Sequence, residues 1–350
     1  MGLRNVFLGL LALLCVSAKS LSSASAADAY AQNPTVTREV AQEATKQTTS
    51  MISGRISSVV SGATGSISPS VPTSPVNTSA LIGDGKAAGD APARGGLWAN
   101  ASHNWMSGKQ ASADFAGTMK VAVGGVDYRI TDQLLLGTSL GYEHGYFSLK
   151  YSGGKMVANN YAFAPYMAYI INDIWSLDAT AGHAWVNYDI SRANGNVAGS
   201  TSGSRWFAAS NLSASTTLGP WRLGASTGYL YSKEDTEDYV ETDGTAARGV
   251  KFRLGQAHAT VRGGYLFLTD WGSVNPFVAA RAEYDANKTA ATAVDAIGTK
   301  GYDDRFGMVF TSGVNLAIGD SHSLSIEAAS SQFRENVDSF TLGGTYRFKF

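Results

Sequence analysis

The side chains that could catalyse a reaction or bind a metal are few and scattered along this chain. The five histidines do not have the spacing of a metal-binding motif: His103, His144, His183, His258 and His322. The chain has one cysteine, so a zinc site would need histidines and carboxylates from separate segments. We therefore predict no metal site, no cofactor and no catalytic residue.

One arrangement would suit hydrolysis. His144 follows Glu143, and Asp303 is adjacent to Asp304, so a general acid–base group could be assembled from them. No nucleophile motif accompanies these residues. The paired glycines at 124–125 and 343–344 are followed by no predicted helix, so they are not phosphate-binding loops. We interpret the charges as solvated loop residues and rank a hydrolase third among the possible functions.

The elements that would position these residues begin after residue 26. Arg4 gives a positive start, residues 6–16 form an apolar stretch too short to span a bilayer, and Ala24 and Ala26 fit an A-x-A cleavage site. This pattern predicts a signal peptide over residues 1–26, with an uncleaved anchor as the alternative. Cleavage would remove Cys15, so the exported protein must be stable without disulfides.

Two further zones precede residue 96. Within residues 27–62, apolar residues recur between Thr37 and Val60 at the spacing of a weakly amphipathic helix. We predict a helix there that could be a short passenger or a plug, with disorder as the alternative. Residues 63–95 are mostly Gly, Ser, Pro, Thr and Ala, which is typical of a flexible linker.

The composition excludes several classes of protein. The 27 Lys and Arg against 28 Asp and Glu leave no basic field to attract nucleic acid. The one long apolar run lies in the leader, which excludes a polytopic helical membrane protein. The chain has 39 Gly and 11% aromatic residues, and only 16% of its residues are charged. This balance favours an all-β protein, either soluble or embedded in a membrane as a barrel.

Residues 96–350 are short alternating segments separated by turn residues, which predict about twelve strands. The expected starts lie near Leu97, Gly117, Leu134, Ala158, Ile174, Ser204, Trp221, Gly249, Val274, Gly301, His322 and Asp338. One face of each strand is apolar with aromatic ends, and the other face is small, polar or charged. Pro165 falls within the fourth strand and would remove a ladder hydrogen bond, which a local bulge would accommodate.

Three features favour a membrane barrel over a soluble sandwich. The first is that short and long connections alternate along the chain, as they do in outer-membrane barrels. The short turns lie around 131–132, 172–173, 219–220, 269–270 and 319–320. The long loops lie near 107–116, 147–157, 191–203, 233–248 and 285–300, while the connection near Glu335 is shorter than this pattern predicts.

The second feature is that aromatic residues gather near strand ends, as girdles at two membrane interfaces would require. The third is that charges fall on the small polar face, where a wet lumen tolerates them better than a closed core. We place nine charges there: Lys120, Asp127, Glu143, Asp178, Arg222, Arg281, Glu283, Glu327 and Arg347. Arg281, Glu283 and Arg347 either hold a plug and set pore selectivity, or only neutralise one another across the lumen.

Residues 96–350 resemble the β-domain of bacterial autotransporters, the translocators of type V secretion. The resemblance rests on six stretches, in order: 124–129 (GGVDYR), 135–137 (LLG), 140–142 (LGY), 275–278 (NPFV), 281–284 (RAEY) and 346–350 (YRFKF). The last strand also resembles an outer-membrane assembly signal, carried by Thr341, Gly343, Tyr346, Phe348 and Phe350. Such a strand offers an edge and aromatic side chains for templated pairing.

The resemblance implies a twelve-stranded barrel plugged by an α-helix, in the bacterial outer membrane with its lipopolysaccharide. It also implies insertion by the barrel assembly machinery with the help of periplasmic chaperones. A typical passenger has hundreds of residues, whereas only about 69 lie between Ala27 and Gly95. We therefore expect an autotransporter-type barrel that translocates or anchors a very short passenger. The alternative is a non-secreting surface barrel that acts as a narrow pore or as a loop-displaying antigen or adhesin.

Overall fold

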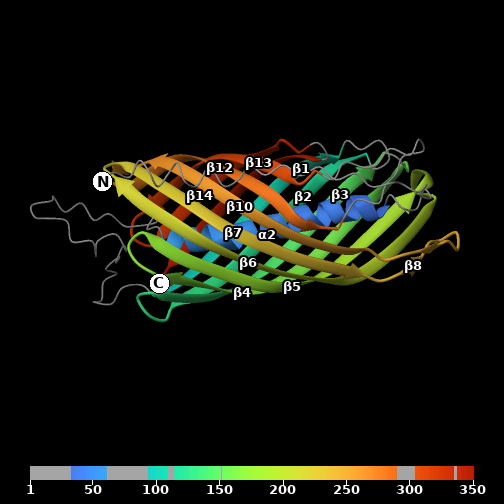
Figure 1. Cartoon of the computed structure of the whole chain (residues 1–350), viewed down its shortest axis with the longest axis horizontal. Coiled ribbons are helices and arrows are strands. Elements are labelled where there is room, and N and C mark those ends of the chain that lie inside the picture. The colour runs from blue at the N-terminus through green and yellow to red at the C-terminus, as the bar shows by residue number, and fades with distance from the viewer. Residues whose placement is uncertain (1–32, 61–93, 109–113, 151, 290–303, 335–336) are drawn as a thin grey trace, which may run out of the picture.

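The protein is a closed β-barrel with an α-helix inside it (Figure 1). The computed structural model describes residues 33–60, 94–108, 114–150, 152–289, 304–334 and 337–350. The expected cleavage site at Ala24 and Ala26, and the linker up to residue 93, lie outside these described residues. Among the described residues, no helix is both long enough and apolar enough to cross a membrane.

Twelve long antiparallel strands form the wall, which confirms the predicted number and fold class. The first six are β1 (Gly95–Gly108), β2 (Phe115–Arg129), β3 (Leu134–Leu149), β4 (Gly154–Ile170), β5 (Trp175–Arg192) and β6 (Val197–Leu218). The second six are β7 (Trp221–Thr236), β10 (Lys251–Tyr265), β12 (Gly272–Lys288), β13 (Phe306–Ile318), β14 (His322–Gln332) and β15 (Val337–Lys349). Each strand pairs with its neighbours, and pairing of β1 with β15 closes the cylinder.

Three minor strands and a turn complete the sheet structure. The strand β11 (Phe267–Thr269) pairs with the start of β12, and β8 (Tyr239–Val240) pairs with β9 (Ala246–Ala247) in the connection after β7. A single 3₁₀ turn, Ala193–Gly195, joins β5 to β6. Asn194 lies in the left-handed region at φ 56°, which Asn tolerates better than most residues.

The connections at the two ends of the barrel differ in length, but less regularly than the sequence predicts. They have two to six residues at the end near Gly95 and four to seventeen at the other end, which we call the long-loop end. The expected long loops at 147–157 and 191–203 were wrong, because β3 to β6 extend through most of both segments. The extensions of β5 and β6 (191–192 and 197–203) are rich in Ser, Thr and Gly, so they look like a loop in the sequence.

Two rings of aromatic side chains surround the outer wall. Trp105, Tyr161, Trp185 and Trp206 are exposed toward the long-loop end, and Tyr128, Trp175, Trp221 and Tyr346 toward the other end. Leucine, valine and alanine lie between them, as expected for a wall in contact with lipid. Pro165 faces outward, and β4 and β5 keep the same register on both sides of it. The expected bulge at Pro165 is therefore absent from the described strand pair.

The inner face departs from the predicted pattern in two ways. Phe115, Met119, Phe147 and Met156 are buried inside the wall, so part of the inner face is apolar rather than small and polar. Lys120, predicted to face the lumen, points outward and is exposed. Both departures have one cause: a helix contacts the inside of β2 to β7, and buried apolar side chains pack against it.

Candidate functional site: the occupied lumen

The helix α2 (Asn33–Val60) has 28 residues, so it is about 42 Å long and extends through the barrel (Figure 1). Its N-terminal part lies at the long-loop end, where Thr37 donates to the sulfur of Met156 near the start of β4. Its later turns lie nearer the opposite end, where Asn211 of β6 donates to Ser53 at 3.0 Å. The helix therefore starts toward the long loops and runs toward the short turns.

One face of α2 is apolar and packs against half of the barrel wall. Val36, Val40, Ala44 and Ile52 are at most 1% exposed and belong to one buried cluster with residues of β1 to β6. Each step of four residues turns a helix by about 40°, so these four residues lie within one half of its circumference. This contact removes the apolar inner surface of the wall from water, which stabilises the helix in its position.

The opposite face of α2 is polar and meets the inner face of β12. Glu39, Gln42, Glu43 and Lys46 follow the three-to-four residue spacing of a helix face. The strand β12 presents inward-facing polar side chains at Arg281, Glu283, Asp285 and Lys288. A charged helix stripe therefore lies against a charged strand stripe.

Three contacts join these two stripes: Lys46 to Glu283, Lys288 to Glu39, and Gln42 to Asp285. Lys46 Nζ lies 2.7 Å from Glu43 of its own helix and 3.6 Å from Glu283, and Lys288 Nζ lies 3.5 Å from Glu39. Gln42 donates to Asp285 at 3.2 Å. Arg334, just after β14, adds ion pairs to Glu283 at 3.3 Å and to Asp285 at 3.0 Å. Charges that would be costly alone are thus paired inside the barrel.

A second buried network surrounds Arg205 of β6. Its guanidinium donates to Glu143 at 2.9 Å and to Glu234 at 2.7 Å, and Tyr188 also donates to Glu234 at 3.0 Å. These four side chains come from β3, β5, β6 and β7 and are at most 2% exposed. Thr48 of α2 donates to Glu143 at 2.8 Å, so this network also holds the helix.

A third cluster lies inside the wall near the short-turn end. The indole of Trp98 donates to the hydroxyl of Tyr166 at 2.8 Å, and that hydroxyl donates to Asp127 at 3.0 Å. The ring of Tyr166 lies over Gly137 of the adjacent strand, where a Cβ would come within 2.3 Å of the ring. Gly137 therefore leaves the space that lets Tyr166 reach Asp127.

The five lumen charges singled out from the sequence all lie on the inner face, but in different environments. Glu143 belongs to the Arg205 network, and Arg281 pairs with Glu283 at 3.1 Å beside the helix. Arg347 and Asp127 lie on either side of Gly96 of β1 near the short-turn end. Glu143 and Glu283 contact α2 directly, through Thr48 and Lys46.

Sequence reasoning missed the residues that complete these networks: Glu39, Lys46, Tyr188, Arg205, Glu234, Asp285, Lys288 and Arg334. Arg205, Glu234 and Asp285 fall in or beside segments that were assigned to long loops. The spacing of Glu39, Gln42, Glu43 and Lys46 could have predicted the polar face of the helix, because residues three or four positions apart share one face.

The arrangement does not support the hydrolase alternative at His144. Glu143 points into the lumen, whereas the neighbouring His144 points outward and contacts Asn159, so the two side chains lie on opposite faces of the wall. In the described parts of the chain, no three His, Cys, Asp or Glu side chains gather in a way that could hold a metal ion. Asp303 lies outside the described residues.

The residues of the expected assembly signal lie in the closing strand. Tyr346 and Phe350 are exposed on the outer wall, whereas Thr341 faces inward and accepts a hydrogen bond from Asn104 of β1 at 3.0 Å. The backbone N–H of Phe350 donates to the carbonyl of Gly95, and the N–H of Gly95 donates back to Phe350. In this folded barrel the edge of β15 is therefore paired with β1 along its length.

Residues 97–329 match the family model of the autotransporter β-domain. The chain belongs to the autotransporter β-domain family. A membrane barrel of this family is an outer-membrane protein, and the barrel with its internal helix agrees with the resemblance inferred from the sequence. A search of curated proteins found no significant match.

Solved structures of other barrels show the same fold. The translocator domain of the autotransporter NalP from Neisseria meningitidis has a TM-score of 0.62 at 13% identity, covering 73% of this chain and 89% of its own. The β-domain of the Bordetella autotransporter BrkA has a TM-score of 0.60 at 17% identity, covering 73% and 100%. An outer membrane channel from Pseudomonas putida has a TM-score of 0.52 at 16% identity, covering 74% and 97%.

Proposed function

We propose that this autotransporter-family barrel anchors a very short N-terminal passenger at the cell surface, with α2 as the plug that passenger transit leaves in the lumen. We further propose that the chain is exported by a cleaved signal peptide over residues 1–26. Periplasmic chaperones and the barrel assembly machinery then insert it into the outer membrane. The direction of α2 is the observation that carries this proposal.

The direction of α2 supports export of the residues that precede it. Outer-membrane barrels place short turns in the periplasm and longer loops outside. Because α2 starts at the long-loop end, with Thr37 beside Met156, the chain that precedes it would emerge at the cell surface. The chain after α2 would lie toward the periplasm, on the same side as the start of β1.

The contacts of α2 support a stable plug rather than a segment in passage. An apolar face packs against β1 to β6, and a polar face is tied to β12 through Glu39, Gln42 and Lys46. Thr48 adds a hydrogen bond to the Arg205 network. A helix held on both faces would close most of the lumen to ions.

The topology can be tested by labelling intact cells. A cysteine introduced at Asp28, in a chain that has lost Cys15 with its signal peptide, would react with a membrane-impermeant maleimide if this segment is at the surface. A cysteine at Asp132, in the turn between β2 and β3, provides the matched periplasmic control. Labelling of Asp28→Cys but not Asp132→Cys supports the proposal, whereas protection of Asp28→Cys contradicts export.

The plug can be tested by conductance in planar bilayers. Deleting residues 33–60 should convert a nearly closed barrel into one with a steady open conductance. Lys46→Met should produce more frequent openings, because it removes the ion pair that joins the helix to Glu283. Equal conductance of the full chain and the deletion variant would contradict a plugging role.

A narrow pore is the second candidate function, and a specific observation favours it. Inner-face side chains of the wall opposite the apolar cluster, such as Arg262, Asn315 and Glu327, are not buried. Arg262 is exposed and the other two are partly exposed, so α2 does not cover this part of the inner wall. A measurable conductance of the unmodified full chain, altered in ion preference by Glu327→Gln, would support this function over a sealed anchor.

A further inference from the structure

A short row of basic side chains, one lysine between two histidines, crosses the outside of the barrel near its closing seam. His103 of β1 pairs in register with Lys120 of β2, and Lys120 pairs with His144 of β3. All three side chains lie on the outer face. Adjacent strands are about 4.8 Å apart, so the three side chains start within roughly 10 Å of one another.

The next residues place polar groups on the same row. Asn159 of β4 pairs with His144, and its Oδ1 lies 2.8 Å from the imidazole and accepts a hydrogen bond from Tyr142 at 3.1 Å. Lys120 makes no ion pair with the described part of the chain. By contrast Lys233, also at the outer wall, lies 2.6 Å from Asp235.

The height of Lys120 corresponds to the outer headgroup region. Lys120 is eight residues along the same strand from Tyr128, which belongs to the aromatic ring at the short-turn end. Eight residues of a strand tilted by about 40° rise roughly 20 Å, and the apolar band of such barrels is about 25 Å tall. Trp105 belongs to the group of aromatic residues toward the long-loop end, and the centroid of its side-chain ring lies 4.2 Å from that of His103. A lysine at this depth can extend its amine to the interface.

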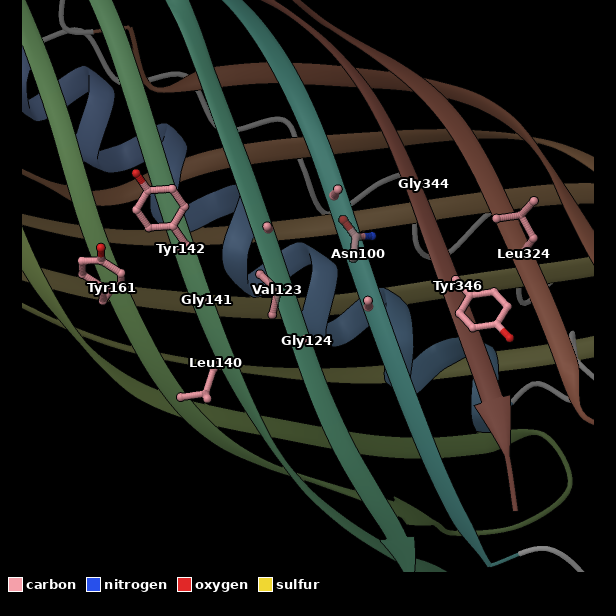
Figure 2. Close-up of a pocket in the computed structure, with 13 residues that line it drawn as sticks. Asn100, Val123, Gly124, Leu140, Gly141, Tyr142, Tyr161, Leu324, Gly344 and Tyr346 are labelled. Carbon is pink, nitrogen blue, oxygen red and sulfur yellow. The ribbon is translucent and has the colours of Figure 1, made fainter.

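An apolar hollow of about 620 Å³ lies beside this row, since Ala101, Ala122 and Tyr142 in its lining are each two residues from His103, Lys120 and His144. Its floor is formed by small residues of the strands that carry the row: Ala99, Ala101, Ala122, Gly124 and Gly344. Leu140, Tyr142 and Tyr161 line one side, and Leu324 and Tyr346 line the other (Figure 2). Figure 2 shows these side chains on the outer surface, with α2 behind the wall. The hollow is therefore open to lipid and not to the lumen.

We propose that the row of Lys120, His103 and His144 and the hollow form one binding site for a phosphorylated glycolipid of the lipid A class. Lys120, with His103 and His144 beside it, would bind a phosphate group, and the hollow would accept an acyl chain. The inference rests on the proposed orientation, in which the long-loop end faces outward, because lipid A lies in the outer leaflet. We choose a phosphorylated lipid because its phosphate would form the ion pair that Lys120 lacks among the described residues.

A second copy of this chain fits the same surface less well. A symmetric dimer across the hollow would bring two copies of Lys120 into a shared, dehydrated contact. Like charges in such a contact repel each other and lose their hydration. A lipid with an acyl chain and an anionic headgroup satisfies both parts of the site at once.

The test is equilibrium binding of defined lipids to the purified full chain in detergent. The probes are diphosphorylated lipid A, its dephosphorylated form, phosphatidylglycerol and inorganic phosphate. We expect Lys120→Gln to weaken lipid A binding at least tenfold and Lys120→Arg to retain it. Lys233→Gln is the matched control for loss of an outer-wall lysine and should bind normally. Heat-dependent migration on SDS gels verifies that each variant is folded.

A second variant tests the hollow without changing the charge. Gly124→Leu would place a side chain in the hollow, and a Cβ at this position comes no closer than 3.6 Å to another atom, so the strand can accept it. We expect weaker binding of lipid A although Lys120 is intact. Equal binding by the Lys120→Gln and Lys233→Gln variants would overturn the proposal. So would equal binding of dephosphorylated lipid A, phosphatidylglycerol or inorganic phosphate.

These outcomes are separate from those of the proposed function. Lipid binding by the purified barrel does not depend on where the N-terminal segment lies in cells. Surface labelling at residue 28 in turn does not depend on Lys120. A failed lipid test with normal surface labelling would therefore overturn only the lipid site.

Discussion

Replacing Arg205 tests whether the buried charge network stabilises the barrel. Arg205 is 1% exposed, and it donates to Glu143 and Glu234, which are 2% and 0% exposed. The Arg205→Met variant keeps an apolar side chain of similar length but leaves both carboxylates without their cation. We expect a large loss in the free energy of unfolding.

The size of the loss follows from burial. Removing one partner of a buried ion pair typically costs about 3–5 kcal/mol, because the remaining charge stays in a poorly solvated site. A loss of about 4 kcal/mol corresponds to roughly a 10³-fold change in the unfolding equilibrium. The triple variant Arg205→Met, Glu143→Gln, Glu234→Gln also removes the two unpaired carboxylate charges. It should therefore recover at least half of the lost free energy of unfolding.

The assay is urea unfolding in detergent micelles, followed by the fraction of protein that migrates as the folded form on unheated SDS gels. Arg222→Met is the matched control. Arg222 also lies on the inner face, but within the described residues its one side-chain hydrogen bond is to the carbonyl of Gly219 at 3.1 Å, so its loss should cost less than about 1 kcal/mol. If Arg205→Met costs no more than Arg222→Met, or if the triple variant is no more stable than the single one, the reasoning is wrong.

Two further predictions concern the ends of the barrel. The N–H of Thr245 donates to Asp243 in the β8–β9 hairpin and, together with Arg192, lowers the pKa of this carboxyl. A lowered folded pKa means that its stabilisation is present above the unfolded value of about 3.9 and is lost as the pH falls through the folded value. Hydrogen exchange of the hairpin, corrected for the intrinsic rate, should therefore accelerate as the pH falls below about 4, and Asp243→Asn should remove this dependence. Persistence of the acceleration in Asp243→Asn would show that another group causes it. At the other end, deletion of Phe350 should lower the outer-membrane yield several-fold, because it removes the residue that exchanges two backbone hydrogen bonds with Gly95. Membrane fractionation measures this yield, and an unchanged yield would count against a role of the last strand in assembly.

The number of strands and the identity of the lipid face could be predicted from the sequence. Alternation with a period of two is a local property of a strand, so Leu136, Leu140 and Tyr142 share the outer face whatever lies inside the barrel. The same parity exposes an error in the prediction. Lys120 and Asp127 are seven positions apart in one continuous strand, so their side chains point to opposite faces.

Parity shows that Lys120 and Asp127 lie on opposite faces, but only the tertiary structure shows why Lys120 is the one on the outer face. Along β2 the inner residues Met119, Val121 and Val123 are more apolar than the outer residues Ala122 and Gly124. This reverses the usual rule for a water-filled barrel, because here the inner face packs against a helix. The sequence of β2 alone does not reveal what covers each of its faces.

The sequence by itself determined a twelve-stranded wall, two aromatic rings and a helix within residues 27–62, since each depends on residues close together in the chain. The tertiary structure alone decided which charges meet. Arg205 and Glu143 are 62 residues apart and lie on β6 and β3, and they come into contact across the inside of the curved wall. Lys46 reaches Glu283 only because α2 lies inside the barrel with its charged face toward β12. Ion-pair partners in this protein are set by closure of the cylinder and by the rotation of the helix within it, and neither is encoded in a local pattern.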